Sequence, residues 1–166
     1  MILDDAARLD RLVTRLLELS RLESDDAAPE PVDLAELARA CAGERARVIG
    51  DRPAPLVARA DALAAAVDNL ISNAVQHAAP ATPITVAVAA GPGRVRLEVH
   101  NQGPPISPAV QAKVWDRFFT TRGDRGGSGL GLAIVRAVAE GHGGRAGVTS
   151  SAAAGTRFWI ELPTGG

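Results

Sequence analysis

The first 24 residues carry apolar side chains at the spacing of an amphipathic helix. Leu9 and Leu16 stand seven residues apart with Leu12 between them, and Ile2 and Leu19 extend the same seam. Aspartate, arginine and glutamate occupy the other faces, a pattern typical of a coiled coil or a helix bundle. An isolated helix of this length is marginally stable in water. We therefore expect it to pair with a helix outside this chain; the alternative is that it packs back on the domain that follows.

The remainder of the chain alternates between helical and strand periodicity. Prolines at positions 29 and 31 exclude a helix there, so residues 25–32 are expected to form a linker. Helices are predicted near residues 34–45, 61–78, 108–118 and 130–141, and strands near residues 46–49, 84–90, 94–101, 147–150 and 156–162. A Gly-Pro-Gly turn separates the second and third strands. These elements predict an α+β fold, in which helices cover one face of a mixed, mostly antiparallel sheet.

Composition narrows the class of protein. The chain has 166 residues, 46% of them hydrophobic, which suits one domain with a small appendage. Eighteen basic and 19 acidic residues give a net charge of -1, so no overall field attracts nucleic acid or an anionic membrane. A single cysteine fits a reducing compartment, and no apolar run approaches the roughly 18 residues of a membrane span. We expect a cytoplasmic segment, which could also be cut from a membrane protein.

The predicted helix at residues 61–78 carries a stripe of amides. Asn69, Asn73 and Gln76 follow the spacing i, i+4, i+7 and therefore share one face. Asparagine is a poor helix former, and a merely solvated face would more typically carry glutamate, lysine or arginine. A row of amide oxygens suits a hard cation such as Mg²⁺, or phosphate groups. A solvated polar face is the alternative.

The predicted strand at residues 94–101 ends on a polar residue that points inward. Asn101 shares the parity of Val95, Leu97 and Val99, so it lies on the apolar face of the strand. Gly103 and two prolines follow at once and end the strand in a sharp turn. A buried amide must be hydrogen-bonded, either as a turn cap or by reading the edge of a ligand. Its amide oxygen could accept a hydrogen bond from the amino group of adenine, and its amide NH₂ could donate one to N1.

A glycine-rich stretch precedes the last predicted helix, with glycines at positions 126, 127, 129 and 131. Glycine costs about 1 kcal/mol in a helix interior, so this crowding indicates unusual turns or a closely approaching ligand. Ser128 is a plausible N-cap, and exposed N–H groups at a helix start bind anions. Arg122 and Arg125 could neutralise phosphate. The spacing fits neither a Walker A loop nor a dinucleotide-binding loop.

Together these motifs, in this order, resemble the nucleotide-binding boxes of sensor histidine kinases. DNLISNAVQHA is similar to the N box, HNQGPPI to the first glycine box, VWDRFFTTR to the F box and GGSGLGLAIV to the second glycine box. The resemblance covers residues 32–163 and implies the Bergerat-type ATP-binding sandwich shared with gyrase, MutL and heat-shock chaperone ATPases. LLELSRLES resembles the end of the second helix of the dimerisation and histidine-phosphotransfer domain. It implies that residues 1–24 are part of that domain and residues 33–166 the catalytic ATP-binding domain.

The resemblance implies ATP and Mg²⁺ as cofactors, with Asn73 as the metal ligand and Asn69 beside the phosphates. The implied ATP-binding positions are Asn69, Asn73, Gln76, His77, Asn101, Gly103, Ile106, Arg122, Arg125, Gly127, Ser128, Gly129, Leu130 and Gly131.

Several positions depart from the family pattern. Asn101 replaces the usual aspartate. Charged hydrogen bonds contribute about 1.5–3 kcal/mol and neutral ones about 0.5–1.5, so the loss is on the order of 1 kcal/mol. We expect ATP binding to be weakened, not abolished. Gln76 replaces a common Lys or Arg, and Pro105 replaces a glycine. Phe118 and Phe119 fall in the F box, which docks on the dimerisation helices; core packing is their alternative role.

No phosphoacceptor is evident, since none of the histidines at positions 77, 100 and 142 lies in the family's acceptor pattern. We therefore expect a fragment of a longer kinase, the alternative being a short protein acting in trans. The implied reaction is γ-phosphate transfer from Mg-ATP to a histidine on the dimerisation domain of the same kinase. A response-regulator receiver domain would be the next partner, and the full-length protein would be a homodimer.

The amide of Asn69 bears on the type of reaction. It stands where hydrolytic members of the superfamily carry a glutamate that activates water, and an amide is no general base. The sequence therefore favours transfer to a protein acceptor over ATP hydrolysis. The alternatives are an anti-sigma-type serine kinase of the same fold and a degenerate, non-catalytic module for nucleotide binding or dimerisation.

Overall fold

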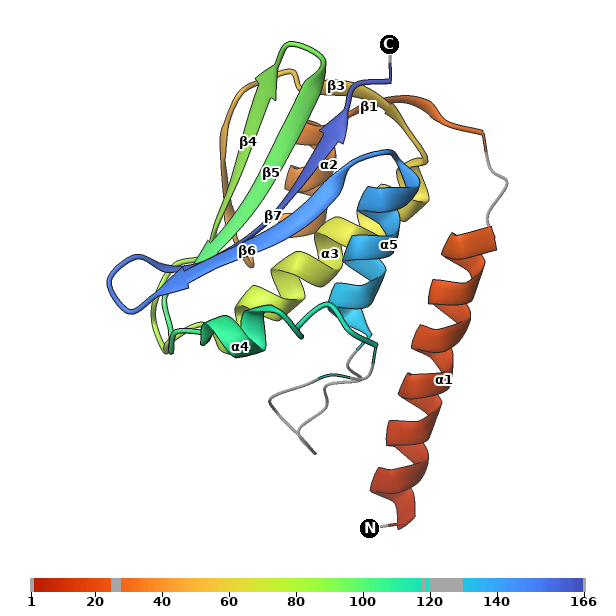
Figure 1. Cartoon of the computed structure of the whole chain (residues 1–166), viewed down its shortest axis with the longest axis vertical. Helices are drawn as coiled ribbons and strands as arrows, with labels where there is room; N and C mark the ends of the chain where they lie inside the picture. The colour runs from red at the N-terminus through yellow and green to blue at the C-terminus, as the bar shows by residue number, and fades with distance from the viewer. Residues whose placement is uncertain (1, 25–27, 118, 120–129, 166) are drawn as a thin grey trace.

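The computed structural model describes residues 2–24, 28–117, 119 and 130–165. A five-stranded sheet is covered on one face by helices, and the N-terminal helix α1 (Ile2–Ser24) runs along the outside of this helical layer (Figure 1). Of the helices in these ranges, none combines the length and the apolar character needed to cross a membrane.

The main sheet has the predicted mixed, mostly antiparallel character. Its strands are β2 (Arg47–Gly50), β4 (Thr85–Gly91), β5 (Arg94–Asn101), β7 (Gly155–Pro163) and β6 (Arg145–Ser151), in that spatial order. Only β2 and β4 are parallel, and the other neighbours are antiparallel. Gly91 pairs with Arg94, so Pro92 and Gly93 form a two-residue turn in which Gly93 takes φ +74°, a region open to glycine.

Three helices cover the inner face of the sheet: α2 (Leu34–Ala42), α3 (Ala60–His77) and α5 (Gly131–Gly141). The predicted parity of β5 is confirmed, because Val95, Leu97 and Val99 are buried together with Asn101. The apolar side chains of α3 that face the sheet are buried as well: Leu63, Val67, Leu70, Ile71 and Ala74. The side chains on the inward face of β5, which follow period 2, and those on the apolar face of α3, which follow period 3.6, are thus buried in one core.

Residues 30–33 are not the expected linker. They form β1 (Glu30–Asp33), which pairs antiparallel with β3 (Pro55–Ala58), a strand that the sequence did not predict. Proline excludes a helix, but it is tolerated in an extended edge strand because its missing N–H is no loss there. Residues 25–32 were predicted to form a linker because proline excludes a helix, and this prediction was wrong at residues 30–32, which are part of β1.

Two helices differ from prediction at their ends. The predicted helix at residues 108–118 is only one turn, α4 (Pro108–Gln111), which begins where Ser107 Oγ accepts a hydrogen bond from Val110 N (3.3 Å). Helix α5 begins at Gly131 with Leu130 as its N-cap residue and without a side-chain cap. Ser128, which the sequence offered as the N-cap, lies outside the described residues.

Helix α1 packs on the domain that follows, as the alternative interpretation had it. Leu12 and Leu16 contact a small buried cluster made by α3 and α5: Ala62, Ala66, Leu130, Ile134 and Val138. Leu9, Val13 and Leu17, on a neighbouring face of α1, are 60, 51 and 66% exposed. The apolar side chains of α1 therefore lie on two faces of the helix: one packs on the following domain, and the other is exposed.

Asp33 fastens the small sheet to α2. Its Oδ1 accepts hydrogen bonds from Ala54 N (2.9 Å) and Ala35 N (3.0 Å), and it is the N-cap of α2. The hydrogen bond from Ala54 holds the pKa of this carboxyl below its ordinary 3.8; burial opposes this, while the Ala35 and Glu36 amides and the Arg39 charge add to it. The ionised form is thus favoured by folding.

We expect Asp33→Ala to lower the free energy of unfolding by roughly 1–2 kcal/mol at pH 7, because two N–H groups lose their acceptor. A carboxyl whose pKa is lowered by folding stabilises above its unfolded pKa and loses that effect as pH falls through the folded value. The gap between wild type and variant, measured by urea unfolding, should therefore narrow toward pH 3. A difference in unfolding free energy that did not change with pH would show that the charge of Asp33 contributes nothing. The Asp33→Asn variant is the uncharged control.

Candidate functional site

Two amides of α3 turn toward the interior: Asn69 is buried and Asn73 is half-buried. Asn69 is 5% exposed, and its Nδ2 donates to the carbonyl oxygen of Ala65 (2.7 Å) in its own helix. Asn73, one turn later, has a buried Nδ2 atom that has no hydrogen-bond partner among the described residues. Gln76 is exposed, so the predicted stripe divides into two inward amides and one outward amide.

Asn101 ends β5 with its amide fully inside the fold. The residue is 2% exposed, and its Nδ2 donates to the carbonyl oxygen of Gln102 (3.2 Å). Its Oδ1 is buried and has no partner within the described part of the chain. Since a buried acceptor without a donor costs about 1–3 kcal/mol, this atom is suited to accept a hydrogen bond from a ligand.

A close backbone contact brings Asn101 and Asn73 to the same end of the sheet. A Cβ at Gly103 would collide with the carbonyl oxygen of His77, the last residue of α3, so only glycine fits there. The carbonyl oxygen of Gln102 also accepts a hydrogen bond from Ala79 N (2.7 Å). The end of β5 is thereby fixed one helical turn beyond Asn73.

The start of α5 completes the arrangement. A Cβ at Gly131 would lie 3.1 Å from Asn69 Oδ1, so the first turn of α5 rests against this amide. Leu130, directly before it, is fully buried. The N–H groups of a first helical turn attract anions. The other predicted members of the glycine-rich segment, Arg122, Arg125, Gly127, Ser128 and Gly129, lie outside the described residues.

The loop after Gly103 is tied to the far edge of the sheet. Ile106, half-buried against the main core, donates its N–H to Ser150 Oγ (2.9 Å). Ser150 Oγ also shares a hydrogen bond with Thr156 Oγ1 (2.7 Å), and Thr156 pairs with Asn101 across β5 and β7. Sequence analysis missed Thr156, although it shares the inward parity of the apolar residues of β7, the signal that identified Asn101.

The donor set suits a metal ion only together with an anionic ligand. Within the described ranges, no group of three or more His, Cys, Asp or Glu side chains could hold a metal. Asn73 offers one amide, whose oxygen and nitrogen positions are interchangeable by a flip. Mg²⁺ commonly combines one or two protein oxygens with water and substrate phosphates. The residues present therefore fit Mg²⁺ that is bound with a polyphosphate.

Comparisons with known proteins agree with this geometry. The family model described as histidine kinase-, DNA gyrase B-, and HSP90-like ATPase matches residues 58–166. The chain is 38% identical over 180 residues to the probable sensor histidine kinase TcrY of Mycobacterium tuberculosis, covering 99% of this chain and 38% of that protein. It is 38% identical over 177 residues to the sensor protein CzcS of Cupriavidus metallidurans, covering 96% and 36%. The chain thus spans little more than a third of the length of these curated relatives.

Solved structures show the same fold. The mycobacterial sensor histidine kinase MprB superposes with a TM-score of 0.72 at 31% identity, over 82% of this chain and 98% of that one. Full-length ShkA in complex with AMPPNP gives a TM-score of 0.80 at 29% identity, over 95% of this chain and 36% of that one. The α+β sandwich expected from the sequence is therefore confirmed as the Bergerat-type fold. The chain belongs to the histidine kinase-, DNA gyrase B- and HSP90-like ATPase family, and it carries the ATP-binding domain of a sensor histidine kinase.

Proposed function

We propose that this chain binds Mg-ATP between α3, the end of β5 and the start of α5, and donates the γ-phosphate to a histidine on a dimerisation domain. One observation carries the proposal: Asn73 and Asn101, from different elements, each bury a polar atom that has no partner among the described residues, and they lie at the same end of the sheet. The bound AMPPNP of the similar ShkA structure supports a nucleotide as the ligand.

Asn101 would recognise the base. Its Nδ2 is engaged by the carbonyl oxygen of Gln102 (3.2 Å), which leaves Oδ1 as the atom available to a ligand. An acceptor there selects a purine with an exocyclic amino group, as in adenine. Guanine presents a carbonyl oxygen at that position, and it could be accepted only if the amide flipped and gave up its bond to Gln102.

Asn73, Asn69 and the first turn of α5 would handle the phosphates. Asn73 would ligate Mg²⁺, which supplies charge neutralisation on the phosphates when it is bound. Asn69 is held by its bond to Ala65 and lies against Gly131, so it would orient the phosphate end of the nucleotide. Neither amide can remove a proton from water, which supports transfer to an acceptor in place of hydrolysis.

The acceptor would come from another domain. Both ring nitrogens of His142 are engaged: Nδ1 contacts the Val138 carbonyl oxygen (2.7 Å), and Nε2 accepts a hydrogen bond from Arg59 N (3.0 Å). His100 Nε2 lies 2.8 Å from the carbonyl oxygen of Ala154. We assign α1 as the second helix of a partial dimerisation bundle, whose open face of Leu9, Val13 and Leu17 would pair with further helices in a homodimer. A response-regulator receiver domain would then take the phosphate from the histidine.

Transfer is tested by incubating the full chain with γ-labelled ATP and a separately produced dimerisation domain that bears the histidine. We expect label on that domain that is labile to acid and stable to base, as for phosphohistidine. Acid-stable label would favour the anti-sigma-type serine kinase instead. Nucleotide binding without any transfer would favour the non-catalytic module.

We expect Asn73→Ala to weaken Mg-ATP binding by about ten- to a hundredfold, because the loss of one interaction with a charged ligand corresponds to about 1.5–3 kcal/mol. Titration calorimetry with and without Mg²⁺ measures this, and the variant should also lose the benefit of added Mg²⁺. Val75→Ala, at an exposed position of the same helix, is the matched control and should bind as wild type does. Equal binding by Asn73→Ala and wild type would contradict the assignment of Asn73.

We expect Asn101→Ala to weaken ATP binding about tenfold and to remove most of the preference for ATP over GTP, because the acceptor for the amino group is gone. Asn101→Asp should bind ATP several-fold more tightly, since a charged acceptor strengthens the bond, and should reject GTP more strongly. Calorimetry with both nucleotides gives the two ratios. An unchanged ratio in both variants would show that Asn101 does not contact the base.

A further inference from the structure

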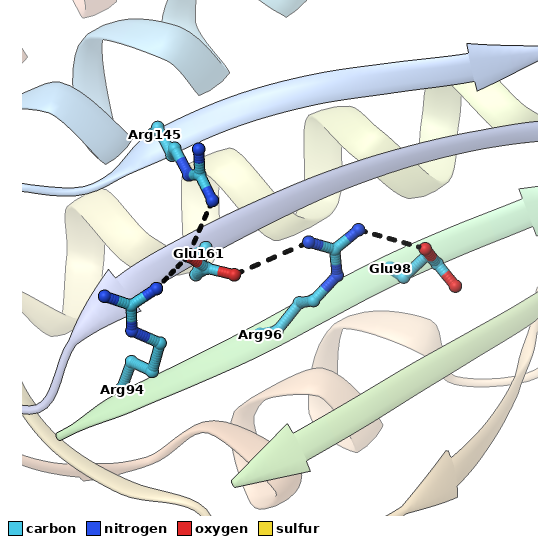
Figure 2. Close-up of polar contacts among 5 residues, drawn as sticks. All are labelled: Arg94, Arg96, Glu98, Arg145 and Glu161. Carbon is cyan, nitrogen blue, oxygen red and sulfur yellow. Dashed lines mark hydrogen bonds and ion pairs between the residues drawn. The ribbon is translucent and has the colours of Figure 1, made fainter. Parts of the chain in front are cut away.

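The face of the sheet opposite to the helices carries a cluster of charged side chains, which we call the arginine face. It combines residues of β5, β7 and β6: Arg94, Arg96, Glu98, Arg157, Trp159, Glu161 and Arg145. Figure 2 shows Glu161 between Arg94, Arg96 and Arg145, with Glu98 beyond Arg96. The strand register explains the cluster, because Arg145, Glu161 and Arg96 are direct neighbours in one row across three strands.

One carboxylate serves three guanidinium groups in this cluster. Glu161 Oε1 accepts from Arg94 (2.8 Å) and Arg145 (3.2 Å), and Oε2 lies 3.5 Å from Arg96. Burial alone would raise the pKa of Glu161, but hydrogen bonding and charge from Arg145, with help from Arg94 and Arg96, lower it below its ordinary value. Glu161 therefore stays ionised and is already shared among its three neighbours.

The arginine face retains excess positive charge and many N–H donors. Four arginines stand against two glutamates, in a chain whose net charge is -1. Arg94 and Arg145 are 63 and 68% exposed. Each guanidinium has five N–H donors, and each carboxylate has about four acceptor sites. The four arginines together therefore carry far more donors than Glu161 and Glu98 can accept. A single exposed ion pair adds little to stability and a network adds more, but the N–H donors in excess of the two carboxylates can serve a further acceptor.

A tryptophan lies at the centre of the same face. The guanidinium carbon of Arg96 is 4.2 Å from the centroid of the Trp159 ring, and that of Arg145 is 5.6 Å away. A Cβ at Gly147 would run into this ring, so the glycine makes the room in which the ring lies across β6. The chain has only two tryptophans and three phenylalanines, and Trp115, in contrast, is buried in the core. Tryptophan and arginine are among the residues enriched at binding hot spots.

We propose that the arginine face docks an acidic protein segment, whose carboxylates bind Arg94, Arg145 and Arg157 around a contact with Trp159. Small residues of β4 adjoin the cluster, since Ala89 pairs with Arg96 and Ala87 with Glu98, and they leave room for apolar side chains of that segment. The carboxylates of Glu98 and Glu161 lie between the arginines and repel a ligand with closely spaced negative charges. This repulsion disfavours nucleic acid and an anionic lipid surface. A partner here would not cover the nucleotide site, which lies on the helical side of the sheet, so this proposal does not depend on the proposed function.

The experiment uses the full chain, labelled with ¹⁵N, and a synthetic peptide of alternating glutamate and alanine. The two indole N–H signals report on the two faces of the sheet. In low salt the peptide should shift the signal of Trp159 and leave that of buried Trp115 in place. Arg94→Ala combined with Arg145→Ala should weaken the peptide affinity about tenfold or more, as expected for close charge pairs across an interface. Arg136→Ala, an exposed arginine of α5 (47%), is the matched control and should change nothing.

Three results would overturn the proposal. The first is no shift of Trp159 at millimolar peptide, and the second is equal affinity of the double variant and wild type. The third is tighter binding of polyuridylate or of phosphatidylserine vesicles than of the acidic peptide, which would identify another class of partner. Unchanged Mg-ATP affinity of the double variant, in the same preparation, separates a loss of docking from a loss of folding or of nucleotide binding.

Discussion

The candidate site depends on the close backbone contact between the end of β5 and the end of α3. Gly103 approaches the carbonyl oxygen of His77 so closely that no side chain fits, and Ala79 N bonds to the carbonyl oxygen of Gln102. This contact holds a strand of the sheet against a helix that covers it. With this contact, the amides of Asn101 and Asn73 share one end of the fold.

The buried polar atoms of this site have a cost that the rest of the core must offset. Asn73 Nδ2 and Asn101 Oδ1 are buried and lack hydrogen-bond partners within the described residues. Such atoms are rare in folded proteins and each needs a cause. A ligand that satisfies both at once gains affinity from groups that are already fixed in place. The sheet and its helices thus hold both amides in place for the proposed nucleotide.

The two faces of the sheet have different chemistry. The inner face is apolar, and the amides of the candidate site lie at one end of it. The outer face carries guanidinium groups, two carboxylates and Trp159, arranged by the register of three antiparallel strands. Because one sheet separates the two surfaces, a partner on the outer face and a nucleotide on the inner face need not compete.

The sequence by itself determined the longer helices, most strands of the main sheet and the direction of several side chains. Period 2 placed Asn101 on the inner face of β5, and period 3.6 put Asn69 and Asn73 on one face of α3, because both rules act between near neighbours in the chain. Only the tertiary structure decided the pairing of β1 with β3, the packing of Leu12 and Leu16 on α5, and the row of Arg145, Glu161 and Arg96. These features depend on strand register and helix packing between distant segments, which local periodicity does not encode.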